Sequence, residues 1–173
     1  LATVFRQKLL AGFRTARTTG AHVHVTAPGD ENYRVVQATG YYRALLPFYR
    51  SLGERANGGY CRAGLHHGRY SEINVETGKG TVEFRLFKSQ LKLAKLIRNA
   101  QFAWAYMELL GQYVPDSTEE AVRAKFLEGL ADLPREETVE LRAWMAAHGH
   151  KVPHAATDLR RLYRGLGVTA AMG

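Results

Sequence analysis

Hydrophobic and polar residues alternate in three short segments of the chain, and turn residues bound each segment. The segments run from Ala21 to Thr26, from Ser71 to Glu76 and from Thr81 to Lys88. Because successive side chains of a strand point to opposite faces of a sheet, this alternation predicts three β-strands. The segment Gly78-Lys79-Gly80 separates the second strand from the third and indicates a hairpin.

Helical spacing of apolar residues accounts for most of the remaining chain. The clearest pattern, over Leu93–Leu110, repeats every three or four positions and predicts an amphipathic helix. Gly40 and Pro47 are expected to interrupt an earlier helix, and Ser117 with Glu120 has the spacing of a capping box. The helices expected besides Leu93–Leu110 cover residues 1–14, 35–52, 117–130, 134–148 and 157–166.

The charge of the chain changes at Pro115. Residues 1–70 hold 10 basic and 3 acidic side chains, whereas residues 116–173 hold 8 basic and 9 acidic ones. All three predicted strands precede Pro115, and only helical patterns follow it. We therefore expect an α+β region over residues 1–115, with an antiparallel sheet backed by helices, and a C-terminal helical appendage over residues 116–173.

The composition is that of an ordinary globular protein. Of the 173 residues, 46% are hydrophobic and 23% are charged. We find no signal segment and no apolar run of the roughly 18 to 20 residues that a membrane helix needs, so we expect a soluble, cytoplasmic protein with no membrane partner. The single cysteine, Cys61, excludes an internal disulfide and any multi-cysteine metal site. Cys61 is either a nucleophile or a small buried residue. A nucleophile needs a base partner, and none is defined here, so the second interpretation is favoured.

The net charge of +8 is concentrated in the first part of the chain. Such a basic region suits nucleic acid, phosphate groups or an acidic small molecule. No run of adjacent basic residues interleaved with aromatic ones stands out. This favours phosphates or a small acid over nucleic acid as the ligand.

The alternation also sorts the strand residues onto two faces of a shared sheet. One face is apolar and should pack on the helices. The other collects His22, His24, Thr26, Glu72, Asn74, Glu76, Glu83, Arg85 and Phe87. A merely solvated face would more often show Lys, Thr, Ser and Gln, so this set favours a functional face. Carboxylates and imidazoles beside a guanidinium suit a divalent cation with bound phosphates, because the cation and the guanidinium hold the same phosphate oxygens.

Four segments occur in the order and spacing of the amidoligase family. They are Gly20–Val25, Arg55–Cys61, Arg69–Asn74 and Thr81–Phe87. From about Thr18 to Leu110 the chain therefore resembles this family, whose catalytic domains are similar to those of glutamine synthetase and glutamate–cysteine ligase. The resemblance implies an antiparallel sheet of the glutamine synthetase type. It also implies an ATP- and magnesium-dependent ligase that joins a carboxylate to an amine through an acyl phosphate.

The resemblance implies catalytic roles for four residues of the first and third strands. His22 and Glu83 resemble ligands of one metal ion. His24 resembles a contact to nucleotide phosphate or a second metal position. Arg85 resembles the clamp on the transferred phosphoryl group, and it would therefore contact both nucleotide and reacting atoms.

Four further residues resemble contacts to the nucleotide or to the acid and amine substrates. Arg55, Arg62 and Tyr70 resemble substrate or nucleotide contacts, and Asn74 resembles a polar residue on the substrate side. The resemblance does not name the acid or the amine, which are small molecules or peptides.

One element of the family pattern, an early strand with two spaced glutamates, lies upstream of these residues. The first residues of the chain resemble the middle of a helix with no cap ahead of it. We therefore expect a preceding segment or a partner chain to supply a Glu-x-Glu strand, and residues 1–173 alone to form no amide. The alternative is a non-catalytic assembly or nucleic-acid-binding component that retains the ligase fold.

Histidines near the C-terminus also imitate a metal-binding pattern. His148, His150 and His154 are spaced like metal ligands. No carboxylate or cysteine accompanies them, so a packing or surface role is the favoured interpretation over a zinc site.

Overall fold

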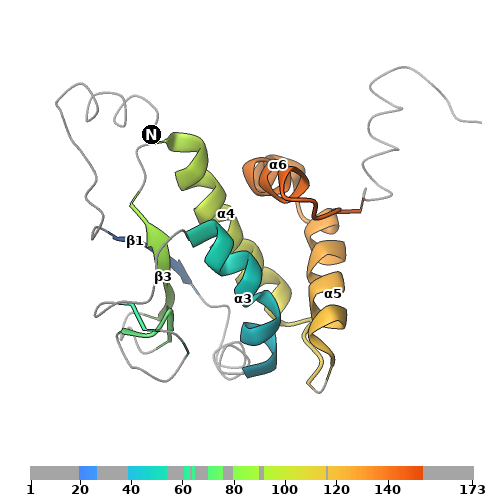
Figure 1. Cartoon of the computed structure of the whole chain (residues 1–173), viewed down its shortest axis with the longest axis horizontal. Coiled ribbons are helices and arrows are strands. Elements are labelled where there is room, and N and C mark those ends of the chain that lie inside the picture. Colours follow the sequence, from blue (N-terminus) through green and yellow to red (C-terminus); the bar gives the residue numbers. More distant parts are fainter. Residues whose placement is uncertain are drawn as a thin grey trace, which may run out of the picture.

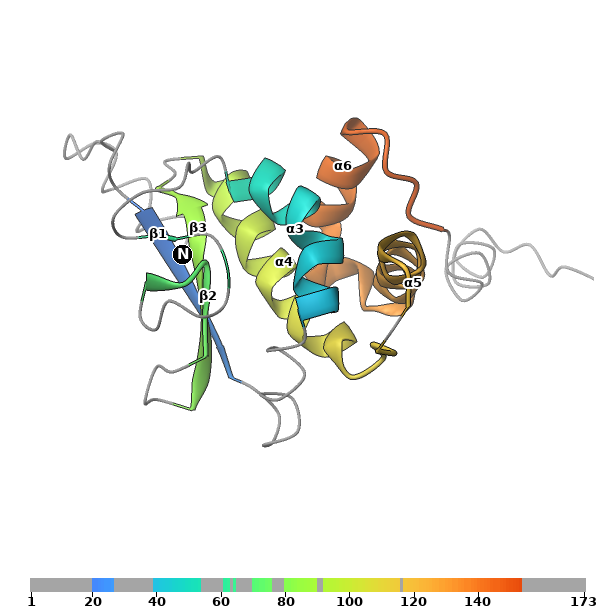
Figure 2. The same ribbon diagram turned by 60° about the horizontal axis from the view of Figure 1, so that its bottom comes forward.

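The chain forms a small sheet covered on one side by two layers of helices (Figures 1 and 2). The computed structural model describes residues 20–26, 39–53, 61–62, 64, 70–75, 80–89, 92–115 and 117–153. The strands are β1 (Gly20–Thr26), β2 (Ile73–Asn74) and β3 (Thr81–Lys88). The helices are α3 (Thr39–Gly53), α4 (Leu93–Leu110), α5 (Glu119–Asp132), the 3-10 turn η2 (Arg135–Glu137) and α6 (Val139–Ala147). The α+β class is confirmed.

The central strand of the sheet is β3, which pairs antiparallel with β1 on one side and β2 on the other. Its residue Glu83 lies opposite His24 of β1 and Asn74 of β2. This register places polar residues that are far apart in the sequence in one row across the three strands.

A β-bulge interrupts the pairing of β1 with β3. Val23 pairs with Phe84 but Ala21 pairs with Phe87, so β3 has one more residue than β1 in this interval. The extra residue reverses the alternation after Arg85. Phe87 is therefore fully buried, with its ring 5.3 Å from that of Tyr49 on α3. The prediction that Phe87 lies on the polar face is wrong for this reason.

The predicted second strand is much shorter than the alternation indicated. Of the described residues 71–75, only Ile73 and Asn74 are β-strand. The backbone N–H of Glu72 donates to the carbonyls of Arg62 (3.0 Å) and Gly64 (3.2 Å) rather than to β3. The carbonyl of Glu72 still accepts the N–H of Arg85 on β3 at 2.9 Å, so the regular ladder is only half formed at Glu72.

The helices form two layers, which Figure 2 shows edge-on beside the sheet. The inner helices α3 and α4 contact β3 and β1, while α5 packs on α3 and α4 and α6 packs on α4. Phe126 of α5 lies 6.2 Å from Phe48 of α3 and 6.0 Å from Phe102 of α4, measured between ring centroids. The hydrophobic core thus continues past Pro115 into the helices expected to form an appendage.

Two local predictions about the helices are wrong. α3 continues through Pro47, and the exposed position of Pro47 keeps its ring out of the core. Near Gly40 the described helix begins at Thr39, and the predicted helical residues before it lie outside the described residues. Gly40 lies against the hydroxyl of Tyr113, where a larger residue would collide. The N-cap of α5 is Thr118 rather than Ser117, because Thr118 Oγ1 accepts the N–H of Ala121 at 3.2 Å.

The longest of the described helices, α4, matches the predicted bounds Leu93–Leu110. Among the described residues no helix combines the length and the apolar character needed to cross a membrane. The predicted helices over residues 1–14 and 157–166 lie outside the described residues, as do Arg55, Glu76 and His154.

Candidate functional site

Five polar side chains meet on the sheet around Glu83. We call His22, His24, Asn74, Glu83 and Arg85 the Glu83 cluster. They come from all three strands, and β3 brings them together because it pairs with both of the other strands. Four of the five carry the catalytic roles that the resemblance implies, so the structure brings those four residues together.

Both oxygens of the Glu83 carboxylate have nitrogen partners. Oε1 lies 2.7 Å from Nδ1 of His22 and 2.8 Å from Nη1 of Arg85, and 3.7 Å from Nε2 of His24. Oε2 accepts a hydrogen bond from Nδ2 of Asn74 at 3.0 Å. The amide of Asn74 thus helps to hold Glu83, and its suggested place on the substrate side stays a prediction.

The environment of Glu83 favours its ionised form. Burial by itself raises the pKa of the carboxyl group, since its side chain is only 8% exposed. Hydrogen bonds from Asn74 and Arg85, together with the charges of Arg85 and His22, act in the opposite direction and leave the pKa below its usual value. Glu83 is therefore a fixed negative charge around which the basic groups are arranged.

The two histidines form the more accessible rim of the cluster. The side chain of His22 is 35% exposed and that of His24 is 39% exposed, against 12% for Arg85. Nδ1 of His24 is also within 3.1 Å of Oγ1 of Thr81. A ligand that approaches this face meets imidazoles first and the guanidinium below them.

Glu72 does not join this cluster. Its carboxylate accepts a hydrogen bond from the hydroxyl of Tyr42 and pairs with Nη2 of Arg50 at 3.6 Å, and both partners belong to α3. Glu72 is almost completely buried. Burial and the hydrogen bond to Glu72 raise the pKa of Tyr42, which stays a neutral donor. The structure thus separates two carboxylates that the alternation had grouped on one face.

Arg62 and Tyr70 lie together before β2. The guanidinium carbon of Arg62 is 5.8 Å from the centroid of the Tyr70 ring, and the backbone N–H of Arg62 donates to the Tyr70 carbonyl at 2.7 Å. The backbone of Arg62 forms an isolated parallel β-bridge with that of Ser71, and Arg62 is exposed. Their suggested contacts to substrate or nucleotide stay predictions.

The fit of a magnesium ion to these residues is poor. Among the described residues no group of three or more His, Cys, Asp or Glu side chains is arranged to hold a metal ion. Magnesium requires near-octahedral oxygen coordination. Within the Glu83 cluster the single carboxylate is surrounded by nitrogen groups. The cluster as it stands therefore lacks the oxygen ligands that a magnesium ion needs.

Other residues considered from the sequence have packing roles. Cys61 is fully buried. The ring of His148 stacks on Trp144 at 4.2 Å, and its Nδ1 is 2.8 Å from the Trp144 carbonyl. The ring of His150 packs edge-on against Phe48. These contacts support the packing interpretation of the two histidines.

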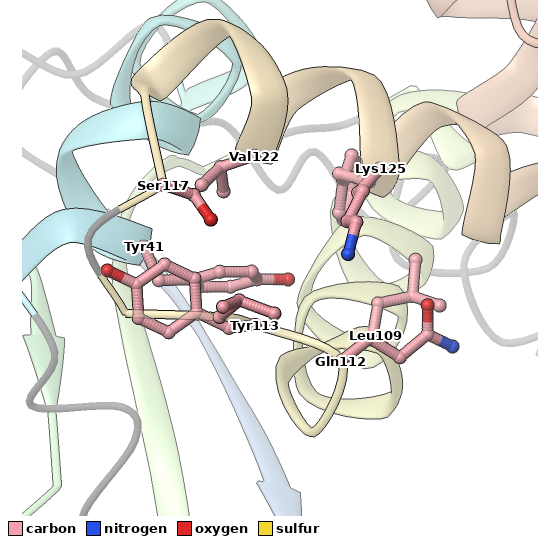
Figure 3. A pocket seen from close by; sticks show the side chains of 9 residues that line it. Tyr41, Leu109, Gln112, Tyr113, Ser117, Val122 and Lys125 are labelled. Carbon is pink, nitrogen blue, oxygen red and sulfur yellow. The ribbon is translucent and has the colours of Figure 1, made fainter.

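A separate small cavity lies between α3, α5 and the segment after α4 (Figure 3). Tyr41, Leu109, Tyr113 and Lys125 are among the residues that line it. It has room for about one water molecule. This volume is too small for a nucleotide, so the cavity does not compete with the Glu83 cluster as the candidate site.

Comparisons with known proteins add no relative. A scan against protein-family models, a search of curated proteins and a search of solved structures found no match to the chain. The geometry of the Glu83 cluster is therefore the main support for any functional proposal.

Sequence reasoning missed the tyrosines that organise this region. Tyr42 and Tyr49 both contact Glu72 through their hydroxyl groups. The Tyr42 hydroxyl donates to the Glu72 carboxylate, and the Tyr49 hydroxyl donates to the Glu72 carbonyl at 2.8 Å. The two residues are seven positions apart on α3, a spacing that is typical of a buried aromatic face. That spacing does not reveal that both hydroxyl groups meet the same glutamate.

Proposed function

We propose that this chain contributes the phosphate-handling part of an ATP- and magnesium-dependent ligase, which joins a carboxylate to an amine through an acyl phosphate. The observation that carries the proposal is the Glu83 cluster, in which His22, His24 and Arg85 surround one ionised carboxylate. These are the residues to which the amidoligase resemblance gives catalytic roles. The sheet of the glutamine synthetase type belongs to the same proposal.

In this proposal the chain's own residues bind and orient the phosphoryl group. Arg85 presents a planar guanidinium that can hold two phosphate oxygens at once. Glu83 and Asn74 hold Arg85 in place, since the Glu83 carboxylate accepts hydrogen bonds from both Asn74 and Arg85. His24, at the accessible rim, contacts phosphate from the side. Preorganised donors of this kind stabilise the charge that develops during phosphoryl transfer.

Magnesium, when bound, would neutralise the negative charge of the phosphate oxygens. The described residues do not complete its coordination, so the proposal requires further carboxylates. A preceding segment or a partner chain with a Glu-x-Glu strand would supply them. Among the described strands β1 pairs with β3 only. An added strand can therefore extend the sheet beside His22 and His24, which belong to β1.

The test measures phosphate release from ATP with magnesium and a pool of carboxylate and amine substrates. The chain is assayed with and without a segment that carries a Glu-x-Glu strand. Amine-dependent release is expected only when that segment is present, and Glu83→Gln should abolish it. Glu128→Gln, a change at an exposed position of α5, is the matched control. Amine-dependent release by residues 1–173 alone would contradict the need for further carboxylates.

The non-catalytic alternative gives a different result in a salt titration. Binding to nucleic acid through phosphate neutralisation weakens steeply as salt concentration rises. Nucleotide binding that depends on magnesium should weaken less and should be lost with a chelator. Steeply salt-dependent nucleic-acid binding, with no nucleotide binding in the presence of the added segment, would contradict the ligase proposal.

A further inference from the structure

The bulge of β3 lies directly beside the Glu83 cluster. It falls between Phe84, which pairs with Val23, and Phe87, which pairs with Ala21, so it contains Arg85 and Leu86. A bulge leaves the local ladder incomplete, and buried backbone N–H groups need another acceptor. On the other side of β3, the regular pairing with β2 extends only as far as Ile73, which lies opposite Phe84. The backbone of Arg85 and Leu86 therefore depends on partners outside a regular ladder.

The hydroxyl of Tyr49 is one of these partners. It accepts the backbone N–H of Leu86 at 2.9 Å and donates to the carbonyl of Glu72 at 2.8 Å. The same Glu72 carbonyl accepts the backbone N–H of Arg85 at 2.9 Å. One hydroxyl group thus bridges the end of β2 and the bulge of β3.

This bridge is buried within the aromatic core. Tyr49 is 1% exposed, and its ring contacts those of Phe84, Phe87 and Phe102. The ring packing holds the hydroxyl group at a fixed position. Phe84 and Phe87 both contact Tyr49, although they are three residues apart on one strand. Regular alternation would place them on opposite faces, so the position of Tyr49 matches the bulged form of β3.

We infer that Tyr49 is a positioning residue for Arg85. Its hydroxyl group takes the place of the missing ladder bond at the bulge, and it thereby fixes the backbone from which the Arg85 side chain reaches Glu83. The guanidinium donates to Oε1 of Glu83 at 2.8 Å from this backbone. The direct consequence concerns only Arg85 and Glu83. The consequence for phosphate binding rests on the proposed function.

The test removes the hydroxyl group and follows the Arg85 side chain. In Tyr49→Phe, nuclear magnetic resonance measures hydrogen exchange at the Leu86 amide and at the guanidinium N–H groups of Arg85. Both are expected to exchange at least about tenfold faster than in the parent protein, because each loses its fixed hydrogen-bond geometry. Tyr106→Phe is the matched control. Tyr106 is equally buried in the aromatic core, and no hydrogen-bond partner of its hydroxyl is found in the described structure. This control is expected to leave Arg85 exchange within about twofold of the parent.

A second control separates positioning from loss of stability. Tyr41→Phe removes a hydroxyl that donates to the Tyr106 carbonyl at 3.3 Å, away from the bulge. It should speed exchange in α4 without a selective effect on Arg85. If Arg85 exchange in Tyr49→Phe stays within about twofold of the parent while Leu86 exchange rises, Tyr49 is only structural and the inference is overturned. The inference is also overturned if Tyr41→Phe accelerates Arg85 exchange as much as Tyr49→Phe does.

A further variant keeps the test decisive if Tyr49→Phe does not fold. Replacing Tyr49 by 3,5-difluorotyrosine retains the hydroxyl group but weakens it as an acceptor for the Leu86 N–H. Exchange at Arg85 should then rise at least about threefold, and an unchanged rate would overturn the inference. These measurements need no nucleotide. Failure of the parent to bind ATP would contradict the proposed function and leave the role of Tyr49 standing.

Discussion

The two buried glutamates of the sheet region, Glu83 and Glu72, have very different surroundings. Glu83 is held by His22, Arg85 and Asn74, and the histidines at its rim are partly exposed. Glu72 is held by α3, and it is only 1% exposed. One carboxylate organises groups that a ligand can reach, whereas the other fastens a helix to the sheet. The exposure of the partners does not separate the two carboxylates, since the side chain of Arg50 is itself 51% exposed. They differ in the elements that hold them, which are the three strands for Glu83 and α3 for Glu72.

The comparison assumes that one core holds both glutamates, and removal of the C-terminal helices tests this. A chain that ends at Pro115 lacks Phe126, Leu141 and Met145, all buried in the same hydrophobic cluster as Phe48 and Phe102. Loss of several buried large side chains costs about 2 to 5 kcal/mol each, which exceeds the stability of a typical domain when summed. We expect the shortened chain to lose cooperative unfolding in urea. A cooperative transition, followed by circular dichroism, would support the predicted boundary at Pro115.

Arg85→Lys tests whether the Glu83 cluster recognises phosphate. Lysine keeps the charge but cannot hold two oxygens in one plane. Ligase activity of the complete assembly is expected to fall by about a hundredfold or more, as is usual when a reacting group is misplaced. The free energy of unfolding should change by no more than about 1 kcal/mol. Arg135→Lys, at an exposed position of η2, is the control. Activity of Arg85→Lys within about threefold of the parent would show that Arg85 is structural.

The pH dependence of the free energy of unfolding tests the ionised state of Glu83, and the expected effect is smaller. The pKa of Glu83 is lowered in the folded protein from its usual value of 4.5. Its stabilising contribution is therefore complete above about pH 4.5 and is lost as the pH falls through the folded-state pKa. The difference in free energy of unfolding between the parent and Glu83→Gln should narrow as the pH falls from 5 to 3. Urea unfolding at several pH values measures this difference, and a constant difference would contradict the lowered pKa.

Local patterns predicted the elements of this fold well. The strands β1 and β3 and the helix α4 follow from periodicity, because each carries enough residues for one period to dominate. The bulge was not predictable, since nothing near Arg85 and Leu86 in the sequence marks it. Its stabilising contact comes from Tyr49, 37 residues away from Leu86 along the chain.

The candidate site was predictable only in part, for a related reason. Alternation grouped His22, His24, Glu83 and Arg85, and the structure brings them together. Alternation also grouped Glu72 with them, but that residue lies beyond the end of β2 and contacts α3. Period-two patterning applies only while the backbone stays in the ladder. The partner of a side chain outside the ladder depends on tertiary packing.

The central claim is that Glu83 serves a ligand site and Glu72 serves the fold. Its most direct test measures magnesium-dependent ATP affinity and the free energy of unfolding for Glu83→Gln and Glu72→Gln, each in the assembly that contains the Glu-x-Glu strand. We predict that Glu83→Gln abolishes nucleotide binding while the protein stays folded. Glu72→Gln should keep the ATP affinity within about threefold and should lose about 1 to 3 kcal/mol of stability, since its hydrogen bonds to a charged group are weakened. Equal ATP affinity in Glu83→Gln and the parent would contradict the claim.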